Sequence, residues 1–234
     1  VMGPDTTVAQ SSPQDGAAKG RKRSWLLGET QGAQVDSGLM LLSDFPVIEV
    51  HRAPFPKDAC AGFDCLAAKG VLMVTLDVAG KGPVTVATTH FNSRGASRAP
   101  EADTHAAYQA QATFLADYVT QAWKRDTPLI IAGDFNMGKR PFRMRALPDA
   151  LDSISGHAQV RDALGTSMAK GVLPHDQAAD ASWIRKRARD LQFVFPASGG
   201  QLEPVGASVP FGSEQGGQSL SDHFGFVIDY KFIS

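Results

Sequence analysis

Short apolar runs bounded by Gly, Pro, Asn and Asp recur along the chain and predict a structure built on β-strands. Strands are expected over residues 38–43, 47–51, 70–78, 84–91, 129–132, 191–195, 202–209 and 224–230, with a further short strand near 25–27. The runs 70–78 and 84–91 are separated by the Gly-rich turn Ala79-Gly80-Lys81-Gly82-Pro83. Two β-rich runs joined in this way predict a hairpin.

One long amphipathic pattern predicts a helix over residues 100–124. Apolar side chains recur there at three-to-four spacing, at Ala107, Tyr108, Phe114, Leu115, Tyr118, Val119, Ala122 and Trp123. A second helix is expected around 143–151, and residues 165–182 are expected to form a loop. Residues 1–34, rich in Gly, Ser, Gln, Asp and Thr, are interpreted as an irregular region. Many strands with at least one long helix favour a sheet-based α/β architecture.

Composition narrows the class of protein. The chain has 234 residues, 43% of them hydrophobic, which is enough for one domain with a substantial core. Its formal net charge of −1 argues against a general nucleic-acid or anionic-membrane binder, although a local basic patch is compatible with it. No apolar run approaches the length of roughly 18 residues that a membrane-spanning helix needs, so no transmembrane segment is predicted.

The sequence contains two cysteines, Cys60 and Cys65, with four residues between them. They fit a small-loop disulfide, which would suit an exported protein, and they equally fit two free thiols in a loop. The compartment is therefore left open between exported and cytoplasmic. A zinc site is not expected, because there is no second cysteine pair and the histidines lack finger spacing.

Three short polar motifs lie in or beside the apolar runs: Thr89-His90-Phe91-Asn92, Gly133-Asp134-Phe135-Asn136 and Ser221-Asp222-His223. Residues i and i+2 of a strand share a side, so the His and Asn of the first motif, and the Asp and Asn of the second, would converge. Oxygen ligands suit a hard cation such as Mg²⁺, and histidine suits proton transfer near neutral pH. Together the motifs predict cleavage of a phosphate ester, although each alone also fits an ordinary turn or sheet edge.

Asp190 opens the apolar strand Asp190-Leu191-Gln192-Phe193-Val194-Phe195. A carboxylate at the mouth of such a strand can orient a catalytic histidine and stabilise its imidazolium form. The alternative is an ion pair with the neighbouring Arg187 or Arg189.

The order TxHxN, GDFN, DxxFxF and SDH along the chain resembles the endonuclease/exonuclease/phosphatase superfamily, the deoxyribonuclease-like fold. The stretch Gly38–Pro46 is similar to a strand pair of this family, and the segment Phe55…Gly62-Phe63-Asp64-Cys65…Lys69-Gly70 is similar to its sphingomyelinase-like branch. The resemblance covers roughly residues 36–234. It implies an α/β fold, a four-layer sandwich of two mixed sheets flanked by helices, in a single domain over 1–234 whose first 34 residues are irregular.

The resemblance also implies catalytic roles. Asp134 and Asn136 would contact the phosphate, the attacking water or a metal. His223 would be the general base that activates water, and Asp190 would orient it. His90 would stabilise the phosphoryl oxygens or assist the leaving group.

Metal and substrate binding are implied in the same way. Asp134, Asn136 and Asp222 would hold a divalent cation, Mg²⁺ in the first place, with Mn²⁺ or Ca²⁺ as alternatives. Contact with the phosphodiester substrate is assigned to Asn92, Arg94, Lys139 and Arg140.

The chain departs from the family pattern at its N-terminal end. The family normally begins with a strand that carries an Asn, followed by a strand that ends in a Gln-Glu pair whose Glu is the principal metal ligand. Neither is found here, and Glu29 is not assigned that role because it does not follow a buried strand. The domain is therefore expected to be N-terminally incomplete, and this chain to be a weak or inactive form of an enzyme.

Three substrate interpretations remain open. Two groups of basic residues lie next to the second motif and before Asp190: Lys139, Arg140, Arg143, Arg145, Arg185, Lys186, Arg187 and Arg189. If both groups border the site, they would form a positive rim suited to DNA or RNA. The alternative is that they are ordinary solvated charges. The segment 62–70 favours a phospholipid head group, as in a sphingomyelinase. A non-catalytic phosphate-binding or interaction module is the third, because fold does not fix function.

Overall fold

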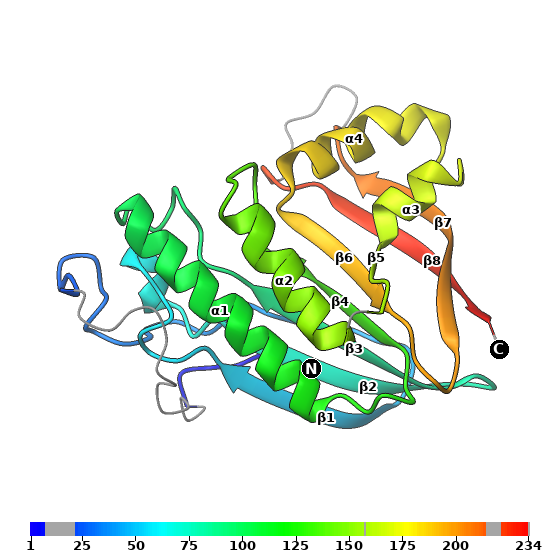
Figure 1. Cartoon of the computed structure of the whole chain (residues 1–234), viewed down its shortest axis with the longest axis horizontal. Coiled ribbons are helices and arrows are strands. Elements are labelled where there is room, and N and C mark those ends of the chain that lie inside the picture. Colours follow the sequence, from blue (N-terminus) through cyan, green and yellow to red (C-terminus); the bar gives the residue numbers. More distant parts are fainter. Residues whose placement is uncertain (8–21, 157, 214–220, 234) are drawn as a thin grey trace.

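The computed structural model describes residues 1–7, 22–156, 158–213 and 221–233, which form two β-sheets and four α-helices (Figure 1). The helices are α1 (Glu101–Ala122), α2 (Arg143–Ser155), α3 (Ala163–Ala169) and α4 (Ala178–Arg187), with 3-10 turns at Gly62–Leu66 and His175–Gln177. Among the helices of these residues, none combines the length and the apolar character that crossing a membrane requires.

The larger sheet has six strands in the order β1-β2-β3-β4-β6-β5. Its strands are β1 (Val47–Pro54), β2 (Gly70–Val78), β3 (Gly82–His90), β4 (Leu129–Asp134), β5 (Arg161–Asp162) and β6 (Asp190–Phe195). Strands β3 and β4 pair in parallel, and the other neighbours pair antiparallel. The sheet is therefore mixed, and the predicted hairpin is its β2–β3 pair.

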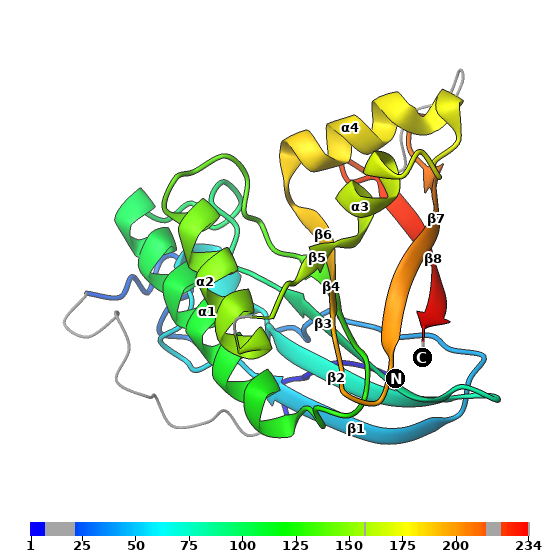
Figure 2. The ribbon, with the colours of Figure 1, turned by 45° about the vertical axis from the view of Figure 1, so that its right-hand side comes forward.

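Helix α1 is the crossover that allows β3 and β4 to run in parallel. Parallel strands cannot be joined by a tight turn, so the chain leaves the end of β3, follows α1 and returns through β4. Both strands consequently end at the same edge of the sheet. Helices α1 and α2 lie side by side over one face of this sheet (Figures 1 and 2).

The main apolar core lies between these two helices and the sheet. Its buried members include Val71, Met73, Ala87, Tyr108, Leu115, Leu129, Ile131 and Leu147. The apolar side chains of β4, at alternating positions, and those of α1, at helical spacing, both face this layer. Their periodicity explains why both elements could be predicted from the sequence.

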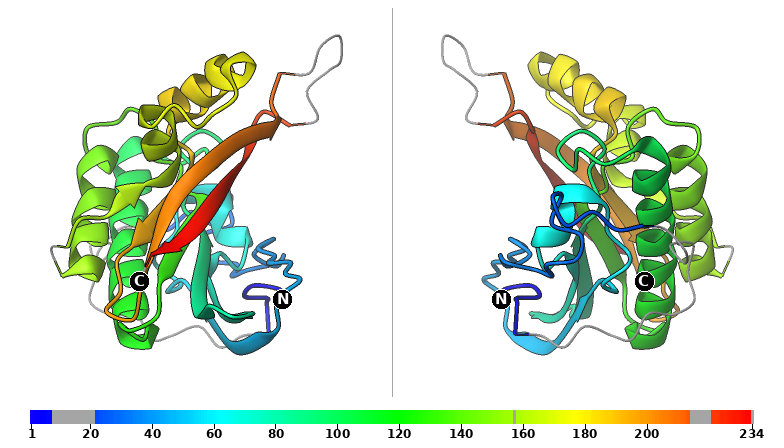
Figure 3. Two further views of the ribbon diagram at one scale, coloured as in Figure 1. Left: turned by 90° about the vertical axis from the view of Figure 1, so that its right-hand side faces the viewer. Right: turned by 90° about the vertical axis from the view of Figure 1, so that its left-hand side faces the viewer.

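The second sheet pairs β7 (Gln201–Phe211) with β8 (Gly225–Ile233) antiparallel. One end of it packs on the six-stranded sheet, where Leu202, Tyr230 and Phe232 meet apolar residues of β3, β4 and β6. The other end packs on α3 and α4, through Phe226 and Ile228. Figures 1 and 2 show this pair of strands on the side of the molecule opposite α1 and α2, and Figure 3 gives two further views of it.

The predicted α/β sandwich is confirmed, with the second sheet formed by two strands in the described part of the chain. The strands expected at 70–78, 84–91, 129–132, 191–195, 202–209 and 224–230 and the helices expected at 100–124 and 143–151 are all present, with ends shifted by a few residues.

Three local predictions were wrong. Residues 25–31 form turns, with the Gly28 amide donating to the Trp25 carbonyl, in place of a strand. Most of 165–182 is helical, in α3 and α4, and not a loop. Residues 38–43 form a single bridge, Met40 to Met2, because no neighbouring strand pairs with them along their length in the described residues. The open question of the cysteines is answered by a disulfide between Cys60 and Cys65.

Candidate active site

Three of the predicted residues lie in one row across neighbouring strands. His90 is the last residue of β3, Asp134 is the last of β4 and Asp190 is the first of β6. In the sheet register His90 pairs with Asp134, and Asp134 pairs with Asp190. Because paired residues of adjacent strands project on the same side, the three side chains share one face at this edge.

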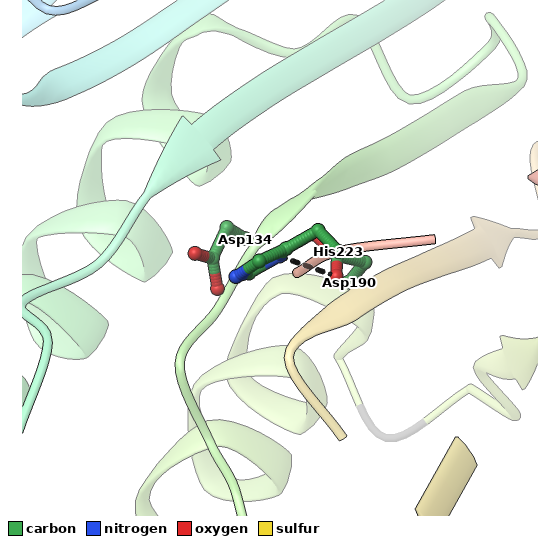
Figure 4. Close-up of side chains that lie close together, drawn as sticks. All are labelled: Asp134, Asp190 and His223. Carbon is green, nitrogen blue, oxygen red and sulfur yellow. Dashed lines mark hydrogen bonds and ion pairs between the residues drawn. The ribbon is translucent and has the colours of Figure 1, made fainter. Parts of the chain in front are cut away.

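His223 joins the row from the segment that leads into β8. Its Nδ1 lies 2.7 Å from Asp190 Oδ2, and Figure 4 shows its ring between the two carboxylates of Asp134 and Asp190. The imidazole therefore donates from Nδ1 to a carboxylate, which leaves Nε2 as the acceptor nitrogen. Burial raises the pKa of the Asp190 carboxyl, although the positive charge of His223 and its hydrogen bond oppose that shift.

The other histidine, His90, is held by a buried lysine. Lys69 is 8% exposed, and its Nζ lies 3.2 Å from His90 Nε2, from the Phe91 carbonyl and from Asp64 Oδ2. An ammonium can only donate, so His90 Nε2 accepts and the ring proton resides on Nδ1. Burial, and then the charge of Lys69, lowers the pKa of His90. The neutral imidazole is thus favoured. His90 Nε2 also lies 3.5 Å from Asp134 Oδ2, and with a neutral ring this is not an ion pair; Lys69 provides the positive charge beside both groups.

Sequence reasoning did not assign a site role to Lys69 or Asp64. The signal was present in the Asp64…Lys69-Gly70 pattern, which was used only for the family resemblance. Burial also lowers the pKa of Lys69, while the neighbouring Asp64 carboxylate opposes this.

The loop after β4 is folded around Asp134. The Asn136 amide N–H donates to Asp134 Oδ1 at 2.8 Å, and Asn136 Nδ2 donates to Asp134 Oδ2 and to the Phe91 carbonyl. Asn136 has φ of +45°, a left-handed conformation that Asn tolerates better than most residues. Each Asp134 oxygen keeps a second lone pair, and Asn136 keeps its amide oxygen, for a further partner.

Arg143 braces this arrangement from behind. Its guanidinium Nη1 donates to the backbone carbonyls of Asn92 at 3.0 Å and Asn136 at 2.8 Å, and its Nη2 to that of Thr104 at 3.4 Å. The side chain is only 1% exposed and stacks on the ring of Tyr108. It therefore ties the loops after β3 and β4 to α1. Of the two interpretations that the sequence left open, a positive rim at the site or ordinary solvated charge, the burial of Arg143 contradicts the second, and its guanidinium lies behind the cavity that it helps to line.

A cavity of about 600 Å³ opens over the row. Its walls carry His90, Asp134, Asn136 and His223, and also the predicted substrate residues Arg94, Lys139 and Arg140. Asn92 is different: it is fully buried, and its side chain accepts from the Ala61 amide and donates to the Ser93 carbonyl. The predicted phosphate contact of Asn92 is therefore wrong, because both ends of its amide group are used inside the protein.

Asp222 lies at the cavity wall and is 79% exposed. Its Oδ2 accepts from Arg189 Nη1 at 3.2 Å, and the same nitrogen lies 3.2 Å from His223 Nε2. The charge of His223, and the hydrogen bond from Arg189, lower the pKa of Asp222. Glu29 is buried elsewhere, where its carboxylate accepts from the amides of Ser24 and Gly62.

The donor set fits a divalent cation. Asp134, Asp190 and His223 each offer one ligand atom, and these atoms lie within 4.8 Å of one another (Figure 4). Since Asp190 and His223 are hydrogen bonded to each other, Asp134 is the member that remains open to a cation. One or two carboxylates and several retained waters are what Mg²⁺ requires, and the adjoining cavity has room for the waters. Asp222 does not belong to this group of three.

Gly133 allows the strands that carry the row to approach. A Cβ at this position would lie 2.1 Å from the Thr89 carbonyl oxygen of β3. We expect Gly133→Ala to force β3 and β4 apart and to lower the free energy of unfolding by about 1–3 kcal/mol, measured by urea denaturation. Gly95→Ala is the control, because a Cβ there meets nothing within 4 Å. Equal midpoints for the two variants would contradict the expectation.

Comparison with known proteins identifies structures with a similar fold. In sequence, no protein-family model and no curated protein matches the chain. Its structure is similar to beta toxin from Staphylococcus aureus, in an F277A, P278A mutant with bound magnesium ions, with a TM-score of 0.55 and 18% identity over 88% of this chain and 70% of that one. It is also similar to D. rerio TDP2 complexed with single-strand DNA product, with a TM-score of 0.53 and 15% identity over 79% and 68% of the two chains. A third similar structure is SmcL, with a TM-score of 0.50 and 18% identity over 85% and 66%.

These likenesses define the class of fold. The chain has the fold of these structures, the deoxyribonuclease-like α/β sandwich that the sequence resemblance predicts. It spans about two thirds of the length of the structures that it matches.

Proposed function

We propose that this chain is a divalent-metal-dependent hydrolase of phosphodiesters, with His223 as general base and Asp190 as the residue that orients it. Mg²⁺ is the proposed cation, held by Asp134 with Asn136, and Mn²⁺ or Ca²⁺ would serve the same oxygen ligands. The magnesium ions of the beta toxin structure and the DNA product of the TDP2 structure support this class of reaction.

The observation that carries the proposal is the pair His223–Asp190 placed beside Asp134. A base whose Nδ1 is fixed by a carboxylate 2.7 Å away presents Nε2 in a set orientation. An ordinary turn or loop does not require two carboxylates on paired strand positions, Asp134 and Asp190, with a histidine hydrogen bonded to one of them. General-base catalysis needs this geometry first and a suitable pKa second.

In the proposed reaction a water molecule in the cavity transfers a proton to His223 Nε2 and attacks phosphorus in line with the leaving oxygen. The new P–O bond forms as the old one breaks, and the leaving oxygen departs with the bonding electron pair and takes a proton from solvent. Asp190 stabilises the imidazolium, which then returns its proton to solvent. Arg189 now lies against Nε2. Because a phosphate is a stronger partner for a guanidinium than a neutral imidazole, substrate is expected to draw Arg189 away from the base.

Other groups around the cavity would stabilise negative charge on the phosphoryl group. When bound, the cation would act as a Lewis acid on a phosphoryl oxygen. His90, which lines the cavity and is held by Lys69, would stabilise the phosphoryl oxygens or assist the leaving group. Arg94, Lys139 and Arg140 would bind the substrate's remaining anionic oxygens, as the cavity walls allow.

We expect Mg²⁺ to support slow hydrolysis of bis(4-nitrophenyl) phosphate, in line with the weak activity predicted from the sequence, and EDTA to abolish it. Asp134→Asn removes the charge of the proposed ligand at constant size. Isothermal titration with Mn²⁺ should show its affinity lowered by at least about tenfold, since even partners of metal ligands contribute that much. Asp126→Asn is the matched control outside the cavity.

The two readouts separate the alternatives. Metal binding without turnover would favour the non-catalytic phosphate-binding module. Turnover that is unaffected by EDTA would contradict the metal-dependent mechanism, and equal Mn²⁺ affinity in both variants would contradict the role of Asp134.

A further inference from the structure

We infer that a second cavity, beside the candidate active site, binds the nucleotide next to the scissile phosphate of a single-stranded nucleic acid. The inference rests on the proposed function and assigns its substrate class. The second cavity measures about 510 Å³ and is lined by Gly138, Lys139, Trp183, Lys186, Arg187 and Arg189.

The two cavities adjoin. Gly138, Lys139 and Arg189 line both of them. A substrate whose phosphate lies over the catalytic row would therefore extend into the second cavity past Arg189, the residue that also contacts His223. A substrate with one small head group would fill the first cavity and leave the second without a role.

The lining of the second cavity is strongly positive. Four of its six lining residues are cations and none is a carboxylate. Over the described residues, no carboxylate lies within ion-pair distance of Lys139, Lys186 or Arg187. By contrast Arg185, on the same helix α4, lies 3.4 Å from Asp162 and does not line the cavity. Cations that the protein leaves without a counter-charge, next to a site for one phosphate, fit a chain of further phosphates.

The cavity also offers planar groups. Trp183 stacks on Phe224, with ring centroids 4.2 Å apart, and the Arg187 guanidinium lies 4.7 Å from the Trp183 ring centroid. Phe224 directly follows His223, so this stack is attached to the segment that carries the general base. Unpaired bases stack on aromatic rings and on guanidinium planes, whereas a duplex keeps its base faces covered. The stack therefore favours a single strand.

The same features disfavour a phosphocholine lipid. Its quaternary ammonium would meet Lys139, Lys186 and Arg187, which repel it, and no acidic side chain lines the second cavity to receive it. Trp183 is half-buried against Phe224, and none of the large apolar side chains that are well exposed, such as Trp25 and Leu26, lines either cavity. Entry into a bilayer at this site is thus not supported by its surface.

The test is fluorescence anisotropy with a labelled single-stranded oligonucleotide of mixed sequence, in EDTA so that no cleavage occurs. The double variant Lys186→Gln, Arg187→Gln should weaken binding by about tenfold and reduce the slope of log K against log salt by about 1.4, the value for two phosphate contacts on a single strand. The matched control removes the same two charges outside the cavity: the double variant Arg145→Gln, Arg185→Gln, on α2 and α4, should stay within about twofold of the wild type.

Absence of oligonucleotide binding by the wild type, or an equal loss in the control, would overturn the inference. So would preferred binding of the matching duplex, or binding to sphingomyelin and phosphatidylcholine vesicles that depends on Lys186 and Arg187. Hydrolysis of bis(4-nitrophenyl) phosphate reports separately on the proposed function. Oligonucleotide binding with no hydrolysis would leave the subsite standing and remove the catalytic proposal; hydrolysis without oligonucleotide binding would do the reverse.

Discussion

Replacing His223 by Ala is expected to lower kcat for Mg²⁺-dependent phosphodiester hydrolysis by about 10²–10⁴-fold, the usual contribution of a general base. The variant loses Nε2, the acceptor that would take the proton of the attacking water. It should bind Mn²⁺ and an oligonucleotide almost as the wild type does, since Asp134 and the second cavity are unchanged. Steady-state kinetics with bis(4-nitrophenyl) phosphate measure the loss, with circular dichroism to verify folding.

Asp190→Asn should cost a comparable amount, because an amide can donate to Nδ1 and so favour the wrong tautomer of His223. The double variant should be little worse than either single variant, since residues that act as a unit are not additive. Losses that multiply in the double variant would show that the two residues act independently, and would contradict the 2.7 Å pair as the working unit.

Two further Asp→Asn changes complete the set: Asp229→Asn is a control, and Asp222→Asn tests the predicted role of that residue as a metal ligand. Asp229 is exposed on β8, away from the cavity, and its replacement should leave kcat unchanged. Asp222 was predicted as a metal ligand from the family pattern, yet its carboxylate contacts Arg189 and is largely exposed. If it binds the cation during turnover, Asp222→Asn should raise the Mg²⁺ concentration needed for half-maximal activity; if it only holds Arg189, that concentration should not change.

There is a physical reason why His90, Asp134 and Asp190 could be predicted as site residues from the sequence. Each residue ends or begins a strand that is marked by a short run of mainly apolar and β-branched residues, and such runs can be recognised from the local sequence. The motif order then supplied what local patterns lack, namely that three strands meet at one edge. The sheet register, with His90 opposite Asp134 and Asp134 opposite Asp190, adds the alignment that a list of motifs does not contain.

The buried cations that hold the site residues, Lys69 and Arg143, could not be predicted from the sequence in the same way. Lys69 and Arg143 are charged residues, which usually lie at the surface, and the sequence placed Arg143 among basic residues that form either a positive rim at the site or ordinary solvated charge. Their partners are remote in the chain: Lys69 reaches His90, and Arg143 reaches Asn92 and Thr104. Burial of a cation depends on such tertiary partners, and one sequence carries little sign of them.

Helices α3 and α4 escaped prediction for a related reason. Gly165, Gly171 and Pro174 resemble loop residues, and short helices form in proteins mainly because an apolar face packs on something else. Here that face includes Ala181 and Ile184, which pack against β7 and β8. The strand expected at 38–43 shows the opposite case, where the local pattern is strand-like but its pairing partner, the segment 1–4, is short and forms a single bridge among the described residues.

Replacing Arg143 by Met is expected to destabilise the protein by about 3–5 kcal/mol. Met keeps an apolar stem of similar shape on α2 but leaves three buried carbonyl groups, of Asn92, Asn136 and Thr104, without their donor, and each such group costs about 1–3 kcal/mol. Urea denaturation measures the change. Arg145→Met, two residues along the same helix and exposed, is the matched control and should alter stability by less than about 0.5 kcal/mol.

The loss should extend to catalysis in the molecules that remain folded. Arg143 joins the loop after β3 to the loop after β4, and those loops follow directly on His90 and Asp134. Asn136 holds a left-handed backbone conformation, costing of order 1 kcal/mol, which persists only while the surrounding contacts enforce it. Without the guanidinium we expect Asn136 to relax, Asp134 to lose its fixed partners, and kcat to fall under conditions where the fold is intact. Arg143→Lys restores the charge but has a single nitrogen to offer where two guanidinium nitrogens serve three carbonyls, so it should recover stability only in part. Full recovery of both stability and kcat by Lys would show that charge alone matters at this position and that the bracing geometry does not.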